Sequence, residues 1–272
     1  MFRLASRGAI EYWEAGELSA LGLAEHAFGT RCGGVSGGPF SSLNVSFRVG
    51  DREEDVRRNL DLFREAFAIP HGNLVLMGQV HGERIHVIDS DEPPPACVPE
   101  CDGLITARPG VALGVRTADC VPLFFVDPVR RVIGAAHAGW RGTALGMAGK
   151  MVAAFVEGFA SRPEDILAAV GPAVGPCCYQ VDDPVHAALA AHAGAKRFLK
   201  PCREEGRWML DLALANRLQI GERGVPETNI HMAELCTACR QELFFSHRAS
   251  SGRSGRQVNF LMLRPADRRK NA

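Results

Sequence analysis

The sequence predicts an α/β fold with mixed, mostly buried β-sheets, and two patterns lead to this expectation. Segments with strand character alternate along the chain with amphipathic segments of helical period. The sequence D-P-V-R (127–130), which is typical of β-turns, lies between two strand segments, so residues 121–137 should form a hairpin. Tight hairpins beside helices favour a mixed sheet over a purely parallel one. Because the chain has no internal repeat and no long linker, we expect residues 1–272 to form one domain.

The expected strands are short, apolar and rich in β-branched or aromatic residues. They cover residues 75–81, 111–116, 123–126, 132–137, 166–171 and 258–263. The expected helices lie between them. The first runs through 56–67, where Val56, Leu60, Phe63 and Phe67 share one face. Others are expected at 143–159, after the possible N-cap Ser161, at 183–193, and from Leu212 to Ile220, ending at Gly221.

The charge balance gives no sign of a polyanionic partner. Lysine and arginine number 31, and so do aspartate and glutamate, which gives a formal net charge of zero. We therefore expect no nucleic-acid partner and no membrane surface, and interpret the basic run 268–270 as solvated tail charge. No segment approaches the roughly 20 apolar residues that span a bilayer.

Cysteine usage indicates the compartment. Nine irregularly spaced cysteines do not suggest a disulfide framework, and the first residues lack the apolar region of a secretory signal. We therefore expect reduced thiols and a cytoplasmic protein. A homo-oligomer is possible.

Three residues carry most of the chemical information. His81 lies in G-Q-V-H-G, Cys120 in R-T-A-D-C-V-P, and His137 in A-A-H-A-G-W-R-G. The predicted hairpin would bring Cys120 and His137 to the same end, and His81 would end another strand, so all three could meet at one sheet edge. Two imidazoles and one thiolate suit zinc, and three protein ligands leave a position for water or substrate. Each residue alone could be a plain buried core residue.

The residues around these three offer further groups for a site. Asp119 could carry a proton or orient a ligand histidine, although a turn aspartate is equally plausible. After His137 the chain enters a predicted helix start, where Arg141 could bind phosphate or carboxylate. Trp140 offers a flat face for a base or sugar, or a buried structural indole. His247, in F-F-S-H-R, is either a pocket residue or merely exposed.

Two other cysteine groups and one glycine-rich segment are harder to interpret. Cys177 and Cys178 are adjacent, which fits one tetrahedral ion poorly, and Cys236-x-x-Cys239 is a lone CxxC that makes only a weak zinc or redox motif. The loop 171–181 could form a pocket wall. Turn-forming residues fill 33–44, whose glycines permit close approach to a ligand, and Asn44 at its end is a candidate substrate-binding residue.

Taken together, these motifs resemble the YfiH/YlmD-like family, which is laccase-domain-containing and was once called multicopper polyphenol oxidase. The resemblance runs from about residue 29 to 264 and rests on G-G-V-S-x-G-P-F-x-S-L-N, Q-V-H-G, D-G-L-I-T, T-A-D-C-V-P, H-A-G-W-R-G, C-T and F-F-S-H-R. It implies a layered α/β (α+β) sandwich of mixed β-sheets flanked by helices, similar to cysteine hydrolases.

The same resemblance implies purine nucleoside metabolism. Family members use phosphate to cleave adenosine, inosine, guanosine and methylthioadenosine to the free base and a ribose 1-phosphate type product, and they also deaminate adenosine. Zn²⁺ would be held by His81, Cys120 and His137, the same set that ligand chemistry selects. Arg48, in S-F-R-V-G-D, falls where the family carries phosphate-site residues.

One departure and one exclusion follow. The family usually has histidine where this chain has Cys32, so a substrate contact there would be altered. A multicopper oxidase needs many histidines in repeated H-x-H patterns. Nine histidines without any H-x-H argue against laccase chemistry, although copper could enter the zinc site adventitiously.

Two other functions compete with the nucleoside enzyme. In a cysteine hydrolase, similar to bacterial toxin glutamine deamidases, Cys120 would be the nucleophile and His137 its base, without metal. In a non-enzymatic scaffold, Cys32 or Cys178 would complete a closed four-ligand zinc site.

Overall fold

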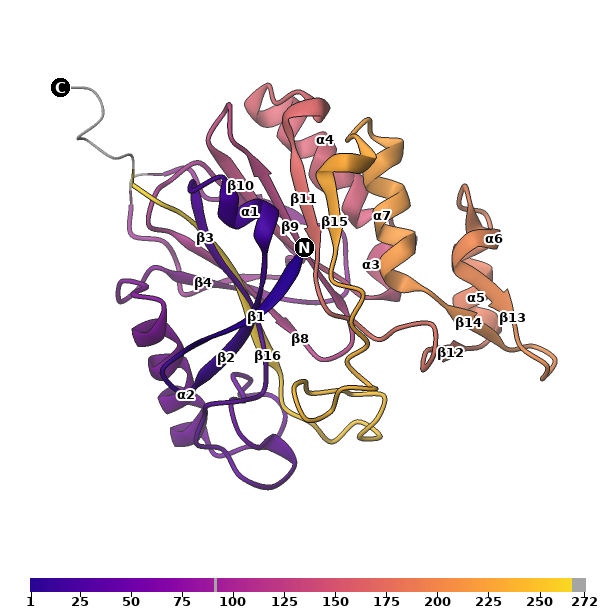
Figure 1. Ribbon diagram of the computed structural model, residues 1–272, viewed down its shortest axis with the longest axis horizontal. Helices are drawn as coiled ribbons and strands as arrows, with labels where there is room; N and C mark the ends of the chain where they lie inside the picture. Colours follow the sequence, from indigo (N-terminus) through magenta and orange to yellow (C-terminus); the bar gives the residue numbers. More distant parts are fainter. Residues whose placement is uncertain (91, 266–272) are drawn as a thin grey trace.

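The computed structural model describes residues 1–90 and 92–265, so the basic run 268–270 lies outside the described residues. Two large β-sheets lie face to face, and helices cover both outer faces (Figure 1). The predicted α/β class with mixed sheets is therefore confirmed. The helices are α1 (Gly16–Ala20), α2 (Glu53–Ala66), α3 (Trp140–Ala144), α4 (Met147–Phe159), α5 (Asp183–Leu189), α6 (Ala195–Phe198) and α7 (Leu212–Glu222).

The larger sheet has seven strands and contains both the first and the last strand of the described residues. In spatial order it contains β1 (Phe2–Arg7), β2 (Ile10–Ala15), β3 (Ala24–Gly29), β16 (Gln257–Leu263), β8 (Ala112–Thr117), β4 (Leu74–Gly78) and β6 (Cys97–Pro99). β4 runs parallel to β8 and β6, whereas the other pairs are antiparallel. The proline-rich segment from residue 92 onward runs into an edge strand, β6.

The second sheet has six strands and contains the predicted hairpin. Its order is β15 (Ile230–Met232), β11 (Leu167–Val170), β9 (Val121–Asp127), β10 (Val132–Ala138), β7 (Gly103–Thr106) and β5 (Ile85–Val87). β9 and β10 pair antiparallel from Val132 opposite Asp127 to Ala138 opposite Val121. The Asp127 carboxylate accepts hydrogen bonds from the backbone N–H groups of Val129 and Arg130, which fixes the turn.

Alternation along β9 shows how the layers are held together. Leu123 and Phe125 face the helices, while Phe124 and Val126 face the other sheet. Between the sheets, the Phe124 ring stacks on Phe28 of β3, with 4.4 Å between centroids. Both faces of the strand are buried, so it reads as a continuous apolar run.

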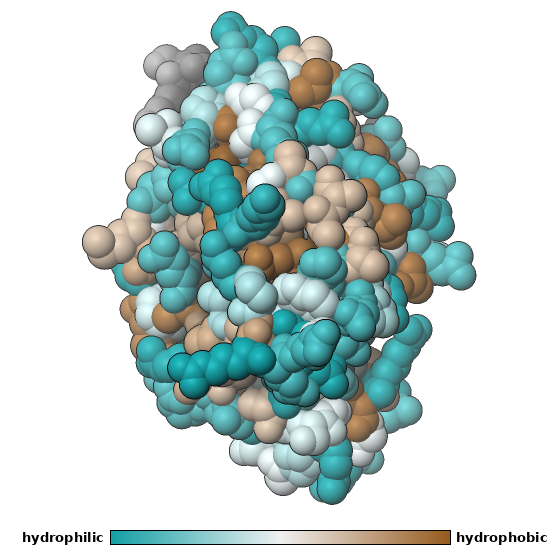
Figure 2. All heavy atoms as spheres, turned by 90° about the vertical axis from the view of Figure 1, so that its right-hand side faces the viewer, coloured by the Kyte–Doolittle hydropathy of each residue, from teal (hydrophilic) through white to brown (hydrophobic). Residues whose placement is uncertain are grey.

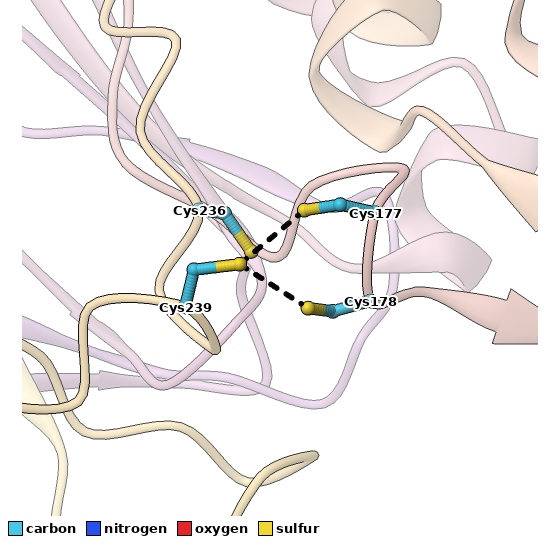
Figure 3. Close-up of side chains that lie close together, drawn as sticks. All are labelled: Cys177, Cys178, Cys236 and Cys239. Carbon is cyan, nitrogen blue, oxygen red and sulfur yellow. Dashed lines mark hydrogen bonds between the residues drawn. The ribbon is translucent and has the colours of Figure 1, made fainter.

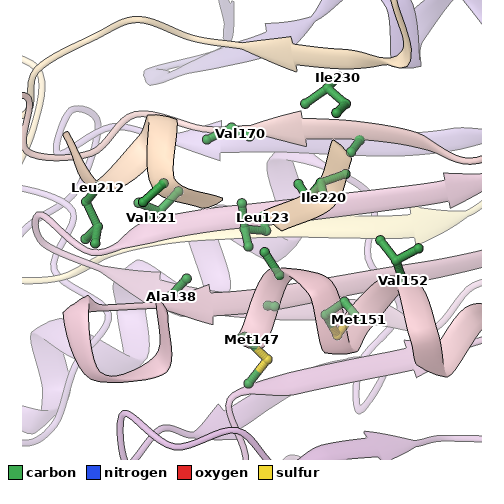
Figure 4. Packing of buried hydrophobic residues seen from close by; sticks show 14 of the residues in the cluster. Val121, Leu123, Ala138, Met147, Met151, Val152, Val170, Leu212, Ile220 and Ile230 are labelled. Atoms are coloured by element: carbon green, nitrogen blue, oxygen red, sulfur yellow. The ribbon is translucent and has the colours of Figure 1, made fainter. Parts of the chain in front are cut away.

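Three apolar layers result. The first lies between the six-stranded sheet and helices α4 and α7, where strand residues such as Val121 and Leu123 pack near Met147, Met151 and Ile220 (Figure 4). The second lies between the sheets. The third lies under α2, on the outer face of the seven-stranded sheet, and includes Phe63 and Phe260.

A third, small sheet stands beside this sandwich. It consists of β12 (Gln180–Val181), β14 (Trp208–Leu210) and β13 (Leu199–Pro201), next to α5 and α6 at the right of Figure 1. Figure 2 views the molecule from this side and shows hydrophobic side chains interrupted by hydrophilic ones over the face. Within the described ranges, none of the helices combines the length and the apolar character needed to cross a bilayer.

The helix predictions need three corrections. Ser161 does not cap an α-helix, because only the 3₁₀ turn Pro163–Asp165 forms before β11 begins. The helix expected at 143–159 is two helices, α3 and α4, separated at Gly146, whose φ is 80°. The helix from Asp183 ends at Leu189 rather than at 193.

Candidate metal and anion-binding site

His81, Cys120 and His137 come together as the sequence predicts. One ligand atom from each lies within 4.8 Å of the others. The Cys120 Sγ is 3.9 Å from Nε2 of His81, and the two imidazole centroids are 4.9 Å apart. Such a set can hold one metal ion.

The three residues do not come from one sheet edge, however. Cys120 directly precedes β9, and His137 lies in β10 opposite Pro122, so the hairpin brings these two together. His81 does not end a strand: β4 stops at Gly78, and His81 lies in the loop beyond it with a φ of 61°. Because β4 belongs to the seven-stranded sheet, the site joins the two sheets.

Asp102 is one residue of this site that the sequence interpretation did not assign. Its fully buried carboxylate lies 2.8 Å from Nδ1 of His137 and accepts backbone N–H bonds from Val80, His81 and Gly82 at 2.8–3.1 Å. A carboxylate behind a histidine leaves Nε2 as the nitrogen free for a metal. The signal was the acid of D-G-L-I-T, immediately before β7.

Backbone geometry keeps the three ligands close. A Cβ on Gly139 would lie 2.9 Å from Cδ2 of His81 and 3.0 Å from the Cys120 Sγ, so a larger residue would displace them. Asp119 has a φ of 87°, in the left-handed region that few side chains adopt. The local chain is therefore held in an uncommon conformation next to Cys120.

The thiol and imidazole shift each other's ionisation. Burial opposes ionisation of the Cys120 thiol, but His137 and His81 outweigh it and lower its pKa to about 6. Burial also disfavours the imidazolium of His137, yet Cys120 and Asp102 raise its pKa to about 9. Burial would raise the pKa of Asp102, and the bonds from His137 and Gly82 lower it. Near neutral pH, the metal-free site is a thiolate–imidazolium pair.

The donors fit zinc. Bonds of about 2.3 Å to sulfur and 2.0–2.1 Å to nitrogen place tetrahedral ligand atoms roughly 3.3–3.8 Å apart. The Cys120 Sγ lies 3.9 Å from Nε2 of His81 and all three ligand atoms lie within 4.8 Å of one another, so an inward movement of the side chains would complete the geometry. A thiolate and two imidazoles are also ligands that zinc favours.

A pocket of about 440 Å³ opens over these ligands. Five arginines line it: Arg48, Arg116, Arg141, Arg248 and Arg256. Among the described lining residues, Asp119 is the single acid. The sequence interpretation named Arg48 and Arg141 but missed the other three. Arg116 opens the R-T-A-D-C motif itself, and that was the available signal.

These arginines are poorly compensated. Within residues 1–90 and 92–265, none of the five forms an ion pair with a carboxylate. Burial lowers the pKa of Arg116, and the neighbouring charges of Arg48 and Arg256 lower it further. Its guanidinium donates to the Met77 carbonyl oxygen at 2.8 Å. A positive wall of this kind favours a bound anion.

Three other residues that the sequence places in the pocket do line it. Trp140, Arg141 and the exposed His247 do line the pocket, and the Arg141 guanidinium lies 4.2 Å from the Trp140 ring centre. Val174 and Tyr179 place the 171–181 loop at the wall, as expected. Trp140 begins α3, so the helix starts directly after Gly139.

Asp119 holds the loop opposite rather than a ligand histidine. Its carboxylate accepts hydrogen bonds from Oγ1 of Thr237 and the backbone N–H of Arg248, both at 2.6 Å. The histidine is oriented by Asp102 instead. Asp119 lies in the pocket wall with both oxygens engaged.

Asn44 and its segment do not reach the pocket. The Asn44 side chain is fully buried; it donates to Asp51 and accepts from the backbone N–H of Arg256 at 2.9 Å. It therefore positions Arg256 from behind. Gly34 permits close approach of other parts of the protein and not of a ligand, because a Cβ at this position would clash with Ser42 and Asn59.

Cys32 also lies apart from the three ligands. Its thiol contacts the carbonyl oxygen of Glu242 at 3.5 Å, and burial raises its pKa. In the described part of the chain, neither Cys32 nor Cys178 joins His81, Cys120 and His137 as a fourth ligand. The closed four-ligand site of the scaffold hypothesis is therefore not formed by these residues.

Comparison with known proteins places this geometry in a family. The family model described as multi-copper polyphenol oxidoreductase laccase matches residues 25–264. The chain belongs to this laccase-domain family. The purine nucleoside phosphorylase YlmD of Geobacillus stearothermophilus is 45% identical over 240 residues, covering 85% of this chain and 87% of the relative. Its Bacillus subtilis counterpart is 36% identical, with 88% of each chain covered.

Solved structures of laccase-domain relatives share the fold. Superposition on the crystal structure of YlmD from Geobacillus stearothermophilus gives a TM-score of 0.90 at 39% identity, covering 97% of this chain and 99% of that one. The hypothetical protein YfiH of Bacillus licheniformis gives 0.89 at 36% identity over the same shares. The YfiH/YlmD resemblance and its layered sandwich are thereby confirmed.

Proposed function

We propose that this laccase-domain protein is a zinc-dependent purine nucleoside phosphorylase that also deaminates adenosine. The observation that carries the proposal is one pocket lined by a His–Cys–His ligand set and by five arginines that form no ion pair with a carboxylate of the described residues. The names of the relatives supply the substrate class, purine nucleosides, and phosphorolysis supplies a reason for the anion site.

Phosphate would bind beside Arg48, Arg116 and Arg256, which line the pocket so close together that the charges of Arg48 and Arg256 lower the pKa of Arg116. The backbone contacts of Arg116 and Arg256 hold their guanidinium groups at the pocket wall before any anion arrives. Prior positioning lowers the entropy lost on binding. From this side, a phosphate oxygen would attack C1′ of the ribose while the bond from C1′ to the purine nitrogen breaks.

The purine would lie against the aromatic part of the pocket. Trp140 and Tyr179 line it, and each already carries an arginine near its ring, at 4.2 Å for Arg141 and 5.1 Å for Arg248. The electrons of the broken glycosidic bond pass to the purine, which must gain a proton. Because both Asp119 oxygens are engaged, we assign this proton to His247, whose side chain lines the pocket.

A zinc ion held by His81, Cys120 and His137 would supply Lewis acidity and lower the pKa of a bound water to about 7. The chain itself contributes the orientation. Asp102 fixes the ring of His137 and the backbone of His81, and Gly139 leaves the space in which the ligands meet.

Chromatography of reaction products tests the proposal. Zinc-loaded protein is incubated with adenosine and with inosine, each with and without phosphate. We expect the free base to appear only when phosphate is present. Adenosine should be converted to inosine both with and without phosphate, and the Cys120→Ala variant should form neither product. Base release at equal rates without phosphate would contradict phosphorolysis, and no product under any condition would reject the nucleoside assignment.

A second candidate is supported by one specific observation. Asp102, His137 and Cys120 form the acid–imidazole–thiol sequence of a cysteine hydrolase, with the pKa of Cys120 lowered to about 6. Such an enzyme would work without metal. Activity that survives chelation but is lost on alkylation of Cys120 would favour it over the zinc enzyme.

A further inference from the structure

Four cysteines outside the pocket converge on one point. Cys177 and Cys178 come from the loop after β11, and Cys236 and Cys239 from the loop after β15 (Figure 3). Their sulfur atoms all lie within 4.8 Å of one another. The Cys239 Sγ is 3.5 Å from that of Cys177 and 3.4 Å from that of Cys178.

The local backbone explains how adjacent cysteines can face the same point. The N–H groups of Cys178 and Tyr179 both donate to the Gly175 carbonyl oxygen at 3.0 Å, which coils the chain into a tight turn. Figure 3 shows both side chains directed from this turn towards Cys236 and Cys239. The two adjacent sulfur atoms therefore face the same point, which the spacing of the two residues alone did not predict.

The second pair is placed by backbone contacts with the first loop. Ala173 and Cys236 form a parallel bridge, and the Thr237 N–H donates to the Ala173 carbonyl oxygen at 3.0 Å. The Gly175 N–H donates to the Cys236 Sγ at 3.2 Å. The sulfur atoms are therefore brought together by two loops that are already fastened to each other.

We propose that Cys177, Cys178, Cys236 and Cys239 bind a structural zinc ion. Zn–S bonds of about 2.3 Å make the sulfur–sulfur edge of a tetrahedron about 3.8 Å, whereas a disulfide requires about 2.05 Å. The separations of 3.5 and 3.4 Å from the Cys239 sulfur to those of Cys177 and Cys178 lie much nearer the zinc value. Four thiolates close the coordination sphere, which is typical of a structural rather than a catalytic zinc site.

This ion would fasten one wall of the pocket. Val174 and Tyr179, on either side of the first cysteine pair, line the pocket. Thr237, between the second pair, donates to the Asp119 carboxylate next to Cys120. The zinc would thus hold together the loop that carries Tyr179 and the loop that anchors Asp119. The proposal of this zinc site does not depend on the proposed nucleoside activity.

Zinc content measured on the folded protein by native mass spectrometry tests the proposal. We expect two zinc ions per chain in the unaltered protein and one in the double variant His81→Ala, Cys120→Ala. Adding Cys239→Ser to that double variant should remove the last ion, whereas adding Cys202→Ser, a half-buried cysteine elsewhere, should not. Retention of zinc after Cys239→Ser would overturn the assignment, and so would iron in place of zinc.

X-ray absorption provides a readout that does not require a variant of the four clustered cysteines to fold. In the double variant His81→Ala, Cys120→Ala, the remaining zinc should show four sulfur neighbours at about 2.3 Å and no nitrogen. A mixed nitrogen–sulfur shell would contradict the proposal. The proposal would also be contradicted if this double variant contained no zinc and its intact mass showed either that all its thiols are free or that two hydrogens have been lost to a disulfide.

Discussion

The Asp102 carboxylate holds His137 by its ring and His81 by its backbone. Its Oδ1 lies 2.8 Å from Nδ1 of His137 and accepts the His81 N–H at 3.1 Å. One buried acid therefore connects a ligand in β10 with a ligand in the loop after β4, across the two sheets. The mutual placement of the two histidines depends on this acid.

Asp102→Asn should therefore weaken the metal site. The amide keeps the size of the side chain but removes the charge that stabilises His137 and replaces one acceptor by a donor. We expect zinc affinity and activity to fall about 10- to 100-fold, the usual cost of losing such a partner. Competition with a chromogenic chelator measures the affinity. Glu100→Gln, an exposed acid two residues away, is the matched control and should change neither.

Gly139→Ala tests whether close approach assembles the ligands. The added methyl would lie 2.9 Å from His81 and 3.0 Å from Cys120, so one ligand must move. We expect zinc affinity to fall roughly 5- to 150-fold, in proportion to the strain of roughly 1–3 kcal/mol that overpacking causes. In Gly158→Ala, on the exposed side of α4, a Cβ meets nothing within 4 Å. This variant should bind zinc normally and unfold at the same or a higher temperature. Equal zinc affinity in both variants would contradict the geometry.

Arg116→Gln and Arg256→Gln test the anion site. Hydrogen bonds to charged groups contribute about 1.5–3 kcal/mol, so each change should raise the KM for phosphate about 10- to 100-fold. The KM for the nucleoside at saturating phosphate should change little. Arg253→Gln, an exposed arginine of the same loop as Arg256, is the control. An unchanged phosphate KM in both pocket variants would place the anion elsewhere.

Alkylation of metal-free protein should follow the lowered pKa of Cys120. The thiolate is the reactive form, so the rate with iodoacetamide should rise with pH to a plateau, with a midpoint at about 6. An ordinary thiol would give a midpoint near 8.5. Cys32, whose pKa is raised, serves as the internal comparison in peptide mass spectra. A midpoint above about 8 for Cys120 would show that His137 does not stabilise its thiolate.

Local pattern was sufficient for the hairpin and for part of the site. The β-turn residues and the two continuous apolar strands at 121–137 predict the hairpin that brings Cys120 next to His137. Ligand chemistry then added His81. The predicted ends of the strands are less accurate. The structure ends β4 three residues before His81, because the loop that carries His81 is shaped by hydrogen bonds to Asp102, more than 20 positions away.

The remaining parts depend on contacts between distant segments. Asp102 acquires its role only when β7 pairs with β10, and Arg256 reaches the pocket because Asn44 fixes its backbone from 212 positions away. The four-cysteine cluster likewise needs the bridge between Ala173 and Cys236. Spacing along the chain shows none of these pairings, which explains why Cys177-Cys178 and the lone CxxC seemed unrelated.

The most direct test of the proposed activity is phosphorus NMR of zinc-loaded protein with inosine and inorganic phosphate. We predict that a sugar-phosphate resonance appears as the phosphate signal falls, with equal amounts of hypoxanthine. Growth of the sugar-phosphate resonance should stop when zinc is chelated and resume when zinc is added back. Hypoxanthine that forms without this resonance, or a reaction that continues unchanged after zinc removal, would contradict zinc-dependent phosphorolysis.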